Sequence, residues 1–216
     1  MERLVILCVD DEVLVLESLK FELRETLLTQ NIHFEMAESG EAALAIIDEI
    51  AAAGDSLALV ISDQKMPGMK GDELLLEVQC RSPETLKILL TGFSDLEAIR
   101  NAINNAGLYR YVTKPWETND LLLTVSEACR KFRLARDLEA KNRRIEKLTL
   151  AMLAALESAN YYNDEDTGEH IRRVARYSAV IAREAGFDEA FVRRIEMYAP
   201  LHDLGKVGVR REILGK

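Results

Sequence analysis

Short apolar runs alternate with helical patterns of apolar residues through the first 118 residues. The runs predict buried strands, and the 3.6-residue patterns between them predict helices. The expected strands are Leu4–Val9, Ile32–Met36, Leu57–Ile61, Leu86–Leu90 and Tyr109–Val112. The expected helices are Val13–Leu28, Glu41–Ala52, Gly71–Cys80, Leu96–Ile103 and one that begins near Thr118. Five such units predict an α/β fold with a doubly wound parallel sheet, whose site lies beyond the carboxyl ends of the strands.

The ends of these expected strands carry reactive side chains. They are Asp10 and Asp11 after the first strand, Asp63 after the third, Thr91 after the fourth and Lys114 after the fifth. Parallel strands end at one rim, so three carboxylates, a hydroxyl and a lysine converge there. Carboxylates in one place repel each other unless a cation neutralises them, and Mg²⁺ suits oxygen ligands. A carboxylate beside such an ion can act as nucleophile and form an acyl phosphate.

The remaining groups at this rim suit the same chemistry. Lys114 provides a fixed positive charge for a transferred phosphoryl group. The hydroxyl of Thr91 can donate a hydrogen bond to a new phosphoryl oxygen, and because that bond exists only after phosphorylation it can shift a conformational equilibrium. Tyr111 lies three residues before Lys114, and its ring is expected to change rotamer together with Thr91.

Four motifs at these positions resemble the receiver domain of two-component response regulators. They are Val9-Asp10-Asp11-Glu12, Ser62-Asp63-Gln64-Lys65-Met66-Pro67-Gly68-Met69, Thr91-Gly92 and Thr113-Lys114-Pro115. The resemblance covers roughly the first 130 residues and implies a (βα)5 fold with strand order 2-1-3-4-5. It also implies a sensor histidine kinase or a phosphotransfer protein as the partner that supplies the phosphoryl group.

The resemblance assigns a role to each motif residue. Asp63 is the implied phosphoacceptor, and Asp10, Asp11, Asp63 and the backbone carbonyl of Lys65 are the implied ligands of Mg²⁺. Thr91 and Tyr111 form the implied switch pair, with Lys114 as the catalytic cation. The peptide bond between Lys114 and Pro115 is expected to be cis, which costs little before proline.

A different pattern follows the receiver-like part. No glycine or proline interrupts Leu121–Asn160, and apolar residues recur every 3.5 positions, which predicts a long helix that pairs with its twin as a coiled coil. One heptad position holds Leu134, Lys141, Leu148 and Ala155, and the other holds Leu138, Ile145, Met152 and Ala159. Lys141 in this seam lowers stability but can fix the register. The alternative is a helix that packs only on its own domain.

The last part of the chain carries a second set of candidate ligands. Asp166 and His170 are four residues apart on one helix face, and His202 and Asp203 are adjacent on a later helix. Imidazole and carboxylate ligands suit Fe, Mn, Zn or Ni. Taken singly, each histidine would more often be an ordinary helix residue.

The surroundings of these residues resemble the start of an HD-GYP domain, the branch of the HD phosphohydrolases that hydrolyses cyclic di-GMP. The motifs are Asp164-Glu165-Asp166-Thr167-Gly168-Glu169-His170-Ile171-Arg172-Arg173-Val174 and Ala199-Pro200-Leu201-His202-Asp203-Leu204-Gly205-Lys206-Val207-Gly208. The resemblance implies that Asp166, His170, His202 and Asp203 bind a transition metal such as Fe or Mn. It implies that Lys206 contacts a phosphate of the substrate.

This second resemblance is incomplete. The family's further ligands and its Gly-Tyr-Pro signature do not occur in the 216 residues, and Arg210-Arg211 stands where the family often has Pro-Asp. We therefore expect the second part to be a truncated all-α HD-type bundle, and we expect this chain not to hydrolyse cyclic di-GMP. A complete HD domain would be required for the transition-metal site.

Together these patterns predict a receiver domain at 1–120, a linker helix at 121–160 and the N-terminal part of an HD-GYP-like domain at 161–216. The predicted function is a response regulator that accepts a phosphoryl group on Asp63 and controls a cyclic di-GMP phosphodiesterase output. The alternative is a non-catalytic, phosphorylation-switched dimerisation or adaptor protein.

Composition and charge limit the classes of partner and the cellular location that we expect. The formal net charge of −9 and the lack of a helix-turn-helix after the receiver disfavour a DNA-binding regulator. The three cysteines show no metal-ligand spacing, which fits a reducing cytoplasm. The opening apolar run is six residues long, too short to cross a membrane, so we expect neither an anchor nor a signal peptide.

Overall fold

A computed structural model describes residues 3–92, 95–161, 168–209 and 213 of the chain. Five parallel strands form one sheet in the order β2-β1-β3-β4-β5. Their bounds are β1 (Leu4–Val9), β2 (Ile32–Ala37), β3 (Ser56–Asp63), β4 (Leu86–Thr91) and β5 (Arg110–Thr113). The predicted strands, their parallel pairing and the order 2-1-3-4-5 are therefore confirmed.

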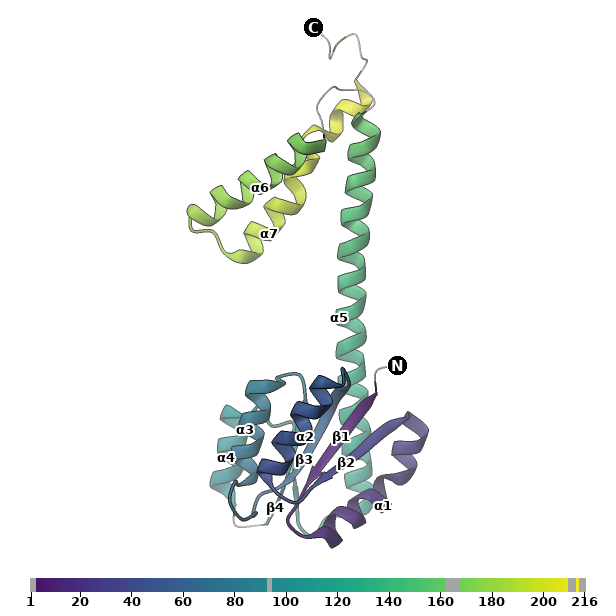
Figure 1. The fold of residues 1–216 in the computed structure, drawn as a ribbon, viewed down its shortest axis with the longest axis vertical. Helices are drawn as coiled ribbons and strands as arrows, with labels where there is room; N and C mark the ends of the chain where they lie inside the picture. Colours follow the sequence, from purple (N-terminus) through teal and green to yellow (C-terminus); the bar gives the residue numbers. More distant parts are fainter. Residues whose placement is uncertain (1–2, 93–94, 162–167, 210–212, 214–216) are drawn as a thin grey trace. The chain divides into compact units, whose positions relative to one another are not determined.

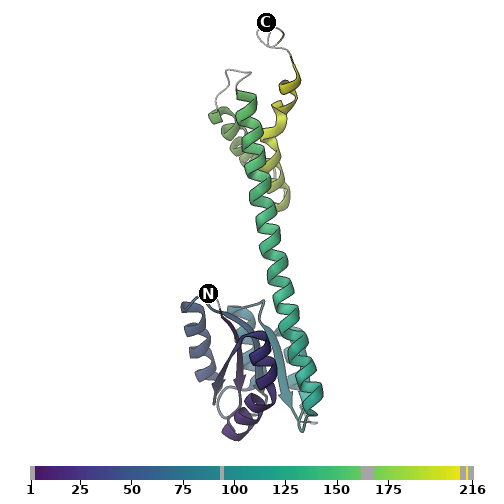
Figure 2. The same ribbon diagram turned by 90° about the vertical axis from the view of Figure 1, so that its right-hand side faces the viewer.

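Helices cover both faces of this sheet (Figures 1 and 2). They are α1 (Val13–Gln30), α2 (Gly40–Ala52), α3 (Gly71–Arg81), α4 (Leu96–Asn105) and α5 (Thr118–Tyr161). Alternate strand residues enter two cores, because successive side chains of a strand point to opposite faces. Val5 and Leu7 pack in the core under α2, α3 and α4. Ile6 and Cys8 pack in the core under α1 and the first turns of α5.

The central strands are buried on both faces, which explains their nearly continuous apolar sequence. All eight residues of β3 are buried. Lys87 of β4 is a buried charged residue in this region, with 1% of its surface exposed. Its ammonium donates to Gln79 Oε1 at 2.7 Å and to the carbonyl of Thr85 at 2.8 Å. Burial lowers the pKa of Lys87 to about 8, although the charge of nearby Glu84 opposes that shift.

Helix α5 begins as part of the core beside the sheet. Leu121, Val125 and Cys129 are fully buried there, and Phe132 is nearly so. Beyond them the helix exposes a row of large apolar side chains, namely Leu134, Leu138, Ile145, Leu148 and Met152. The predicted continuous helix over Leu121–Asn160 is confirmed. Its pairing with a second copy, and the divisions at 120 and 160, stay predictions.

The chain forms two compact units, Met1–Asp137 and Leu138–Lys216. In the second unit, α6 (Gly168–Glu184) packs against α7 (Glu189–Tyr198), and a 3₁₀ segment, η1 (Ala199–Gly208), follows. Asp188 caps α7 by accepting a hydrogen bond from the backbone N–H of Phe191 at 2.6 Å, as its position predicts. Gly186, expected at the end of the preceding helix, has φ of +82°, a value suited to glycine.

The helical spacing of Ile171, Val174, Ser178 and Ile181 predicts that these residues form the inner face of α6, but the residues that the structure buries are different. Ala175, Ala179 and Ala182 are buried, whereas Ile181, which the sequence places on the apolar face, is 67% exposed. Small side chains let α7 approach closely, so that Val192 is fully buried against the alanines. Across the part of the chain that the structure describes, none of the helices combines the length and the apolar character needed to cross a membrane.

Candidate functional site

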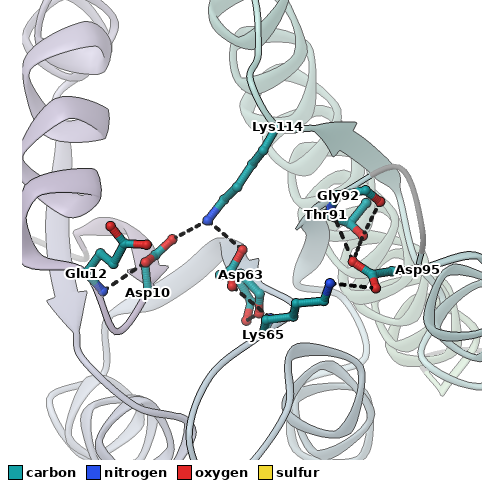
Figure 3. A network of polar contacts seen from close by, with 9 residues as sticks. Asp10, Glu12, Asp63, Lys65, Thr91, Gly92, Asp95 and Lys114 are labelled. Carbon is teal, nitrogen blue, oxygen red and sulfur yellow. Dashed lines mark hydrogen bonds and ion pairs between the residues drawn. The ribbon is translucent and has the colours of Figure 1, made fainter.

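The carboxyl ends of β1 and β3 bring two buried carboxylates to one cation. The ammonium of Lys114, just beyond β5, lies 2.8 Å from Asp10 Oδ2 and 2.6 Å from Asp63 Oδ1 (Figure 3). Asp10 is 1% exposed and Asp63 is 6% exposed. The sheet order explains this meeting, since β1 and β3 are neighbours and all five strands end at the same rim. The convergence predicted for these three residues is therefore observed.

Backbone groups fix both carboxylates. The N–H of Lys65 donates to Asp63 Oδ2 at 2.7 Å, and the N–H of Glu12 donates to Asp10 Oδ1 at 2.9 Å. Gly71, the first residue of α3, leaves room for this loop: a Cβ atom there would lie 2.2 Å from the carbonyl oxygen of Asp63. One oxygen of each carboxylate is thus held by the backbone, and the other faces Lys114.

Electrostatics favour a positive charge between these carboxylates. Burial by itself disfavours the charged ammonium of Lys114, but its hydrogen bonds to Asp10 and Asp63 and their negative charges outweigh burial. The pKa of Lys114 consequently lies above its ordinary value.

The donor set at this rim fits a hard divalent cation. Asp10 and Asp63 turn oxygens toward a common point, as their shared contact with Lys114 shows, and Asp11 is exposed beside the same loops. Carboxylate oxygens are the ligands that Mg²⁺ prefers. Among the described residues no group of three or more His, Cys, Asp and Glu side chains forms a ready-made metal cluster. The fit therefore rests on the chemistry of these oxygens.

Thr91, at the end of β4, is 1% exposed and belongs to a second polar group. Its hydroxyl lies within hydrogen-bond distance of two acceptors, Asp95 Oδ2 at 3.2 Å and the carbonyl oxygen of Gly92 at 3.3 Å. The N–H of Gly92 donates to Asp95 Oδ2 at 3.3 Å. The ammonium of Lys65 lies 3.2 Å from Asp95 Oδ1. Figure 3 shows the Lys65 side chain directed toward Asp95, on the opposite side of the Asp63 loop from Lys114.

Two further expectations meet the structure at β5. Tyr111 lies on this strand and is 47% exposed. An aromatic side chain needs such free space around it if it is to change rotamer. The Lys114–Pro115 peptide bond is cis, as predicted. The roles expected for Tyr111, Thr91 and the Lys65 carbonyl are not tested by these positions and stay predictions.

A buried polar chain next to Asp63 was not anticipated from the sequence. Gln64 donates to Asp72 Oδ1 at 2.7 Å and accepts from the Asp72 backbone N–H at 3.1 Å. The other oxygen of Asp72 accepts a hydrogen bond from Asn101 of α4 at 2.7 Å. These bonds tie the residue after Asp63 to α3 and α4. The signal for these bonds in the sequence is weak: Asp72 is a polar residue on the buried side of α3.

The contacts of Asp95 were also not predicted from the sequence. A Ser-Asp pair before an apolar helical run reads as a helix cap, which is the commonest use of such an aspartate. The structure instead turns its carboxylate toward Thr91 and Lys65, and α4 receives no side-chain cap.

The second unit brings together one pair of its predicted site residues. The rings of His170 on α6 and His202 on η1 lie 5.9 Å apart between centroids. The Nδ1 atom of His202 is 2.9 Å from the carbonyl oxygen of Ala199. Asp166 and the side chains of Asp203 and Lys206 lie outside the described residues. The meeting of the two histidines agrees with the expected ligand pair, and the rest of that set stays a prediction.

Comparison with known families divides the chain in the same two parts. Residues 6–126 match the response regulator receiver domain, and residues 167–216 match the HD domain. A solved receiver domain of an HD domain-containing protein from Pseudomonas fluorescens is 33% identical, with a TM-score of 0.54, and the match covers 61% of this chain and 98% of that one.

Two curated relatives match larger shares of the chain. A cyclic di-GMP phosphodiesterase of Thermotoga maritima is 29% identical over 83% of this chain and 52% of its own length. The cyclic di-GMP phosphodiesterase response regulator RpfG of Xanthomonas campestris is 31% identical over 73% of this chain and 45% of its own length. The chain thus spans about half the length of these relatives. With the parallel sheet, the Asp10–Lys114–Asp63 cluster and these matches, the chain belongs to the response regulator receiver family and carries an HD-type region after its receiver.

Proposed function

We propose that Asp63 accepts the phosphoryl group in a phosphorelay. The observation that carries this proposal is the buried Asp63 carboxylate, held by the Lys65 N–H on one oxygen and paired with Lys114 on the other. An oxygen of Asp63 attacks the phosphorus of a phosphohistidine or of acetyl phosphate. The bond from phosphorus to the leaving group breaks, the leaving group keeps the electron pair, and an acyl phosphate forms on Asp63.

The surrounding residues have separate tasks in this step. Lys114 offsets the negative charge of the transferred group, and Asp10 holds Lys114 in place through its 2.8 Å contact. Asp10, Asp11, Asp63 and the carbonyl of Lys65 are the groups that would hold Mg²⁺, which when bound neutralises negative charge on the phosphoryl oxygens. Thr91 and Tyr111 report the phosphorylated state by a change in their contacts.

We further propose that the output is of the HD-GYP type in the full-length protein, with cyclic di-GMP as its substrate. The approach of His170 to His202 and the names of the two relatives support this proposal. Asp166, Asp203 and Lys206 would complete the ligands and the phosphate contact, with Fe or Mn as the metal. A sensor histidine kinase or phosphotransfer protein in the cytoplasm is the proposed donor, with no role for DNA or a membrane.

A second candidate function is a dimerising adaptor without catalysis. The observation that favours it is the exposed apolar row on α5, from Leu134 to Met152. Its members recur at alternating spacings of three and four, or of seven across Lys141, as in the seam of a two-stranded coiled coil. Both candidates share the homodimer and the phosphorylated receiver, and they differ only in hydrolysis.

One set of assays tests both candidates. The purified chain is incubated with acetyl phosphate with and without Mg²⁺, and labelling, bound metal and cyclic di-GMP hydrolysis are measured. We expect labelling that is lost when EDTA removes Mg²⁺, and no hydrolysis by these 216 residues. Absence of labelling in the presence of Mg²⁺ would overturn the phosphorelay proposal. Metal-dependent hydrolysis would show that this chain is itself the phosphodiesterase and would rule out the adaptor.

A further inference from the structure

Asp95 stands at the start of α4 but does not cap it. An aspartate at this position usually accepts hydrogen bonds from backbone N–H groups of the first turn, and replacing such a cap costs about 1 kcal/mol. In this chain the side chain of Asp95 makes no such bond. Its two oxygens instead receive the Thr91 hydroxyl and the Gly92 N–H on one side and the Lys65 ammonium on the other.

Both side chains that Asp95 holds flank the phosphoacceptor. Lys65 is two residues after Asp63, and its own N–H is bound to the Asp63 carboxylate at 2.7 Å. Thr91 is the next residue after Leu90, which pairs with Asp63 in the sheet. Figure 3 shows Lys65 and Thr91 on the same side of Asp63, with their polar ends facing Asp95.

A phosphoryl group on Asp63 changes this balance. It adds about 1.5 to 2 negative charges and three strong acceptor oxygens. The Thr91 hydroxyl and the flexible Lys65 ammonium are natural donors to it, but both already contact Asp95. The carboxylate of Asp95 also repels a second negative group close by.

Only 14% of the Asp95 side chain is exposed, so water competes little for the oxygen that faces Thr91 and Gly92.

We propose that Asp95 is a positioning residue that opposes phosphorylation: it holds the Thr91 hydroxyl and the Lys65 ammonium in the unphosphorylated protein, and both must leave it to serve a phosphoryl group on Asp63. The proposal rests on the proposed phosphorelay function and adds a residue that sets its equilibrium. A purely structural role for Asp95 predicts the opposite sign, because loss of a loop contact would weaken the site.

The test measures binding of beryllofluoride, an analogue of the phosphoryl group, to the full 216-residue chain with Mg²⁺ by titration calorimetry. Asp95→Ala is expected to bind about tenfold more tightly than wild type, the worth of one charge-assisted hydrogen bond. Asp95→Asn keeps an oxygen for Thr91 but loses the charge that holds Lys65, so about a threefold gain is expected. Glu97→Gln removes an exposed charge on the same helix and is expected to stay within about twofold of wild type.

A double substitution separates the two anchors. If Asp95 acts through Thr91, the gain from Asp95→Ala falls to about threefold in a Thr91→Val background, because only the Lys65 contact remains to be released. An undiminished gain there would overturn the role assigned to Thr91. Asp95→Asn provides the same comparison should Asp95→Ala fail to fold.

The outcomes distinguish a failure of this inference from a failure of the proposed phosphorelay function on which it rests. Wild type that binds beryllofluoride, with Asp95→Ala and Asp95→Asn equal to it or weaker, overturns the role of Asp95 and leaves the phosphoacceptor intact. Wild type that neither binds beryllofluoride nor is labelled by acetyl phosphate overturns both. Tighter binding in the order Ala, Asn, wild type supports the inference.

Discussion

In the unit Met1–Asp137, neighbouring strands carry Asp10, Asp63 and Thr91 to one rim, and Lys114 joins them from beyond β5. In the unit Leu138–Lys216, the candidate ligands come from separate helical segments, and His170 and His202 are the described pair that meets. A parallel sheet gathers residues that are distant in sequence because all its strands end at one edge. A helical site depends instead on how each helix packs on the next, so its assembly follows less directly from local sequence.

Burial shows the same difference. The two cores of the receiver, one on each face of the sheet, consist mainly of large aliphatic side chains. The core of the second unit is a small group around Ala179, Ala182 and Val192, and among its described residues Tyr177, Val180 and Ile181 are exposed. Exposed apolar faces of this kind drive association. Because the receiver has its own cores, we expect it to keep its function when the second unit is changed.

The largest expected effect tests that independence. Asp63→Asn removes the nucleophile and should lower labelling by acetyl phosphate more than about 100-fold. His202→Ala alters the second unit only and should leave labelling within about twofold. Asp48→Asn, a surface carboxylate paired with Arg81, is the matched control for loss of one acidic group. Strong labelling of Asp63→Asn, measured on phosphate-affinity gels, would contradict the assignment.

The next effect concerns the backbone packing that shapes the receiver site. Gly71→Ala places a methyl group against the Asp63 carbonyl and should lower the free energy of unfolding by about 3 kcal/mol. Gly54→Ala has open space around it but a φ of +71°, so about 1 kcal/mol is expected. Urea unfolding of the two variants measures the difference. Equal losses would mean that close approach at Gly71 is not a constraint.

A smaller, pH-dependent effect is expected from Lys87. Its folded pKa of about 8 lies below the ordinary 10.5, so between these values the unfolded chain binds more protons. Stability therefore rises as pH increases through this window, by about 2 kcal/mol from pH 7 to 10. The unfolding free energy of wild type minus that of Lys87→Met, measured across this range, isolates the contribution. A flat difference would show that Lys87 is not buried as a charged group.

The smallest expected effect concerns the exposed row on α5. If it pairs with a second copy, Ile145→Asn should weaken the dimer by about tenfold, and Lys141→Leu should tighten it by a similar factor. Arg143→Ala, outside the seam, is the control. Sedimentation equilibrium gives the dissociation constants. A chain that remains monomeric at high concentration, with both variants unchanged, would contradict the coiled coil. It would favour the alternative in which α5 packs only on its own domain.

Sequence pattern predicted the receiver in detail for physical reasons. The apolar runs are buried strands, and nearly every strand boundary falls within one residue of the expected one, for instance Leu4–Val9. The site could be predicted because its main groups stand at strand ends, where topology alone brings them together. The strand order came from resemblance to receivers rather than from periodicity, and the structure confirms it.

Contacts between loops and helices could not be predicted in the same way. Gln64 and Asp72 are eight residues apart, and their reciprocal bonds depend on how the β3–α3 loop folds. Asp95 stands at a position typical of a helix cap, whereas its contacts with Lys65 and Thr91 depend on the tertiary fold. The buried face of α6 depends on its partner helix, and alanines rather than Ile181 proved able to meet it closely.

The most direct test of the account is to locate the phosphoryl group chemically. Wild-type protein is labelled with acetyl phosphate and Mg²⁺, the acyl phosphate is reduced with borohydride, and the peptides are sequenced by mass spectrometry. Phosphorylation of Asp63 predicts a homoserine at position 63 and at no other carboxylate. A homoserine at Asp10 or Asp11, or a labelled protein with Asp63 unmodified, would contradict the central claim.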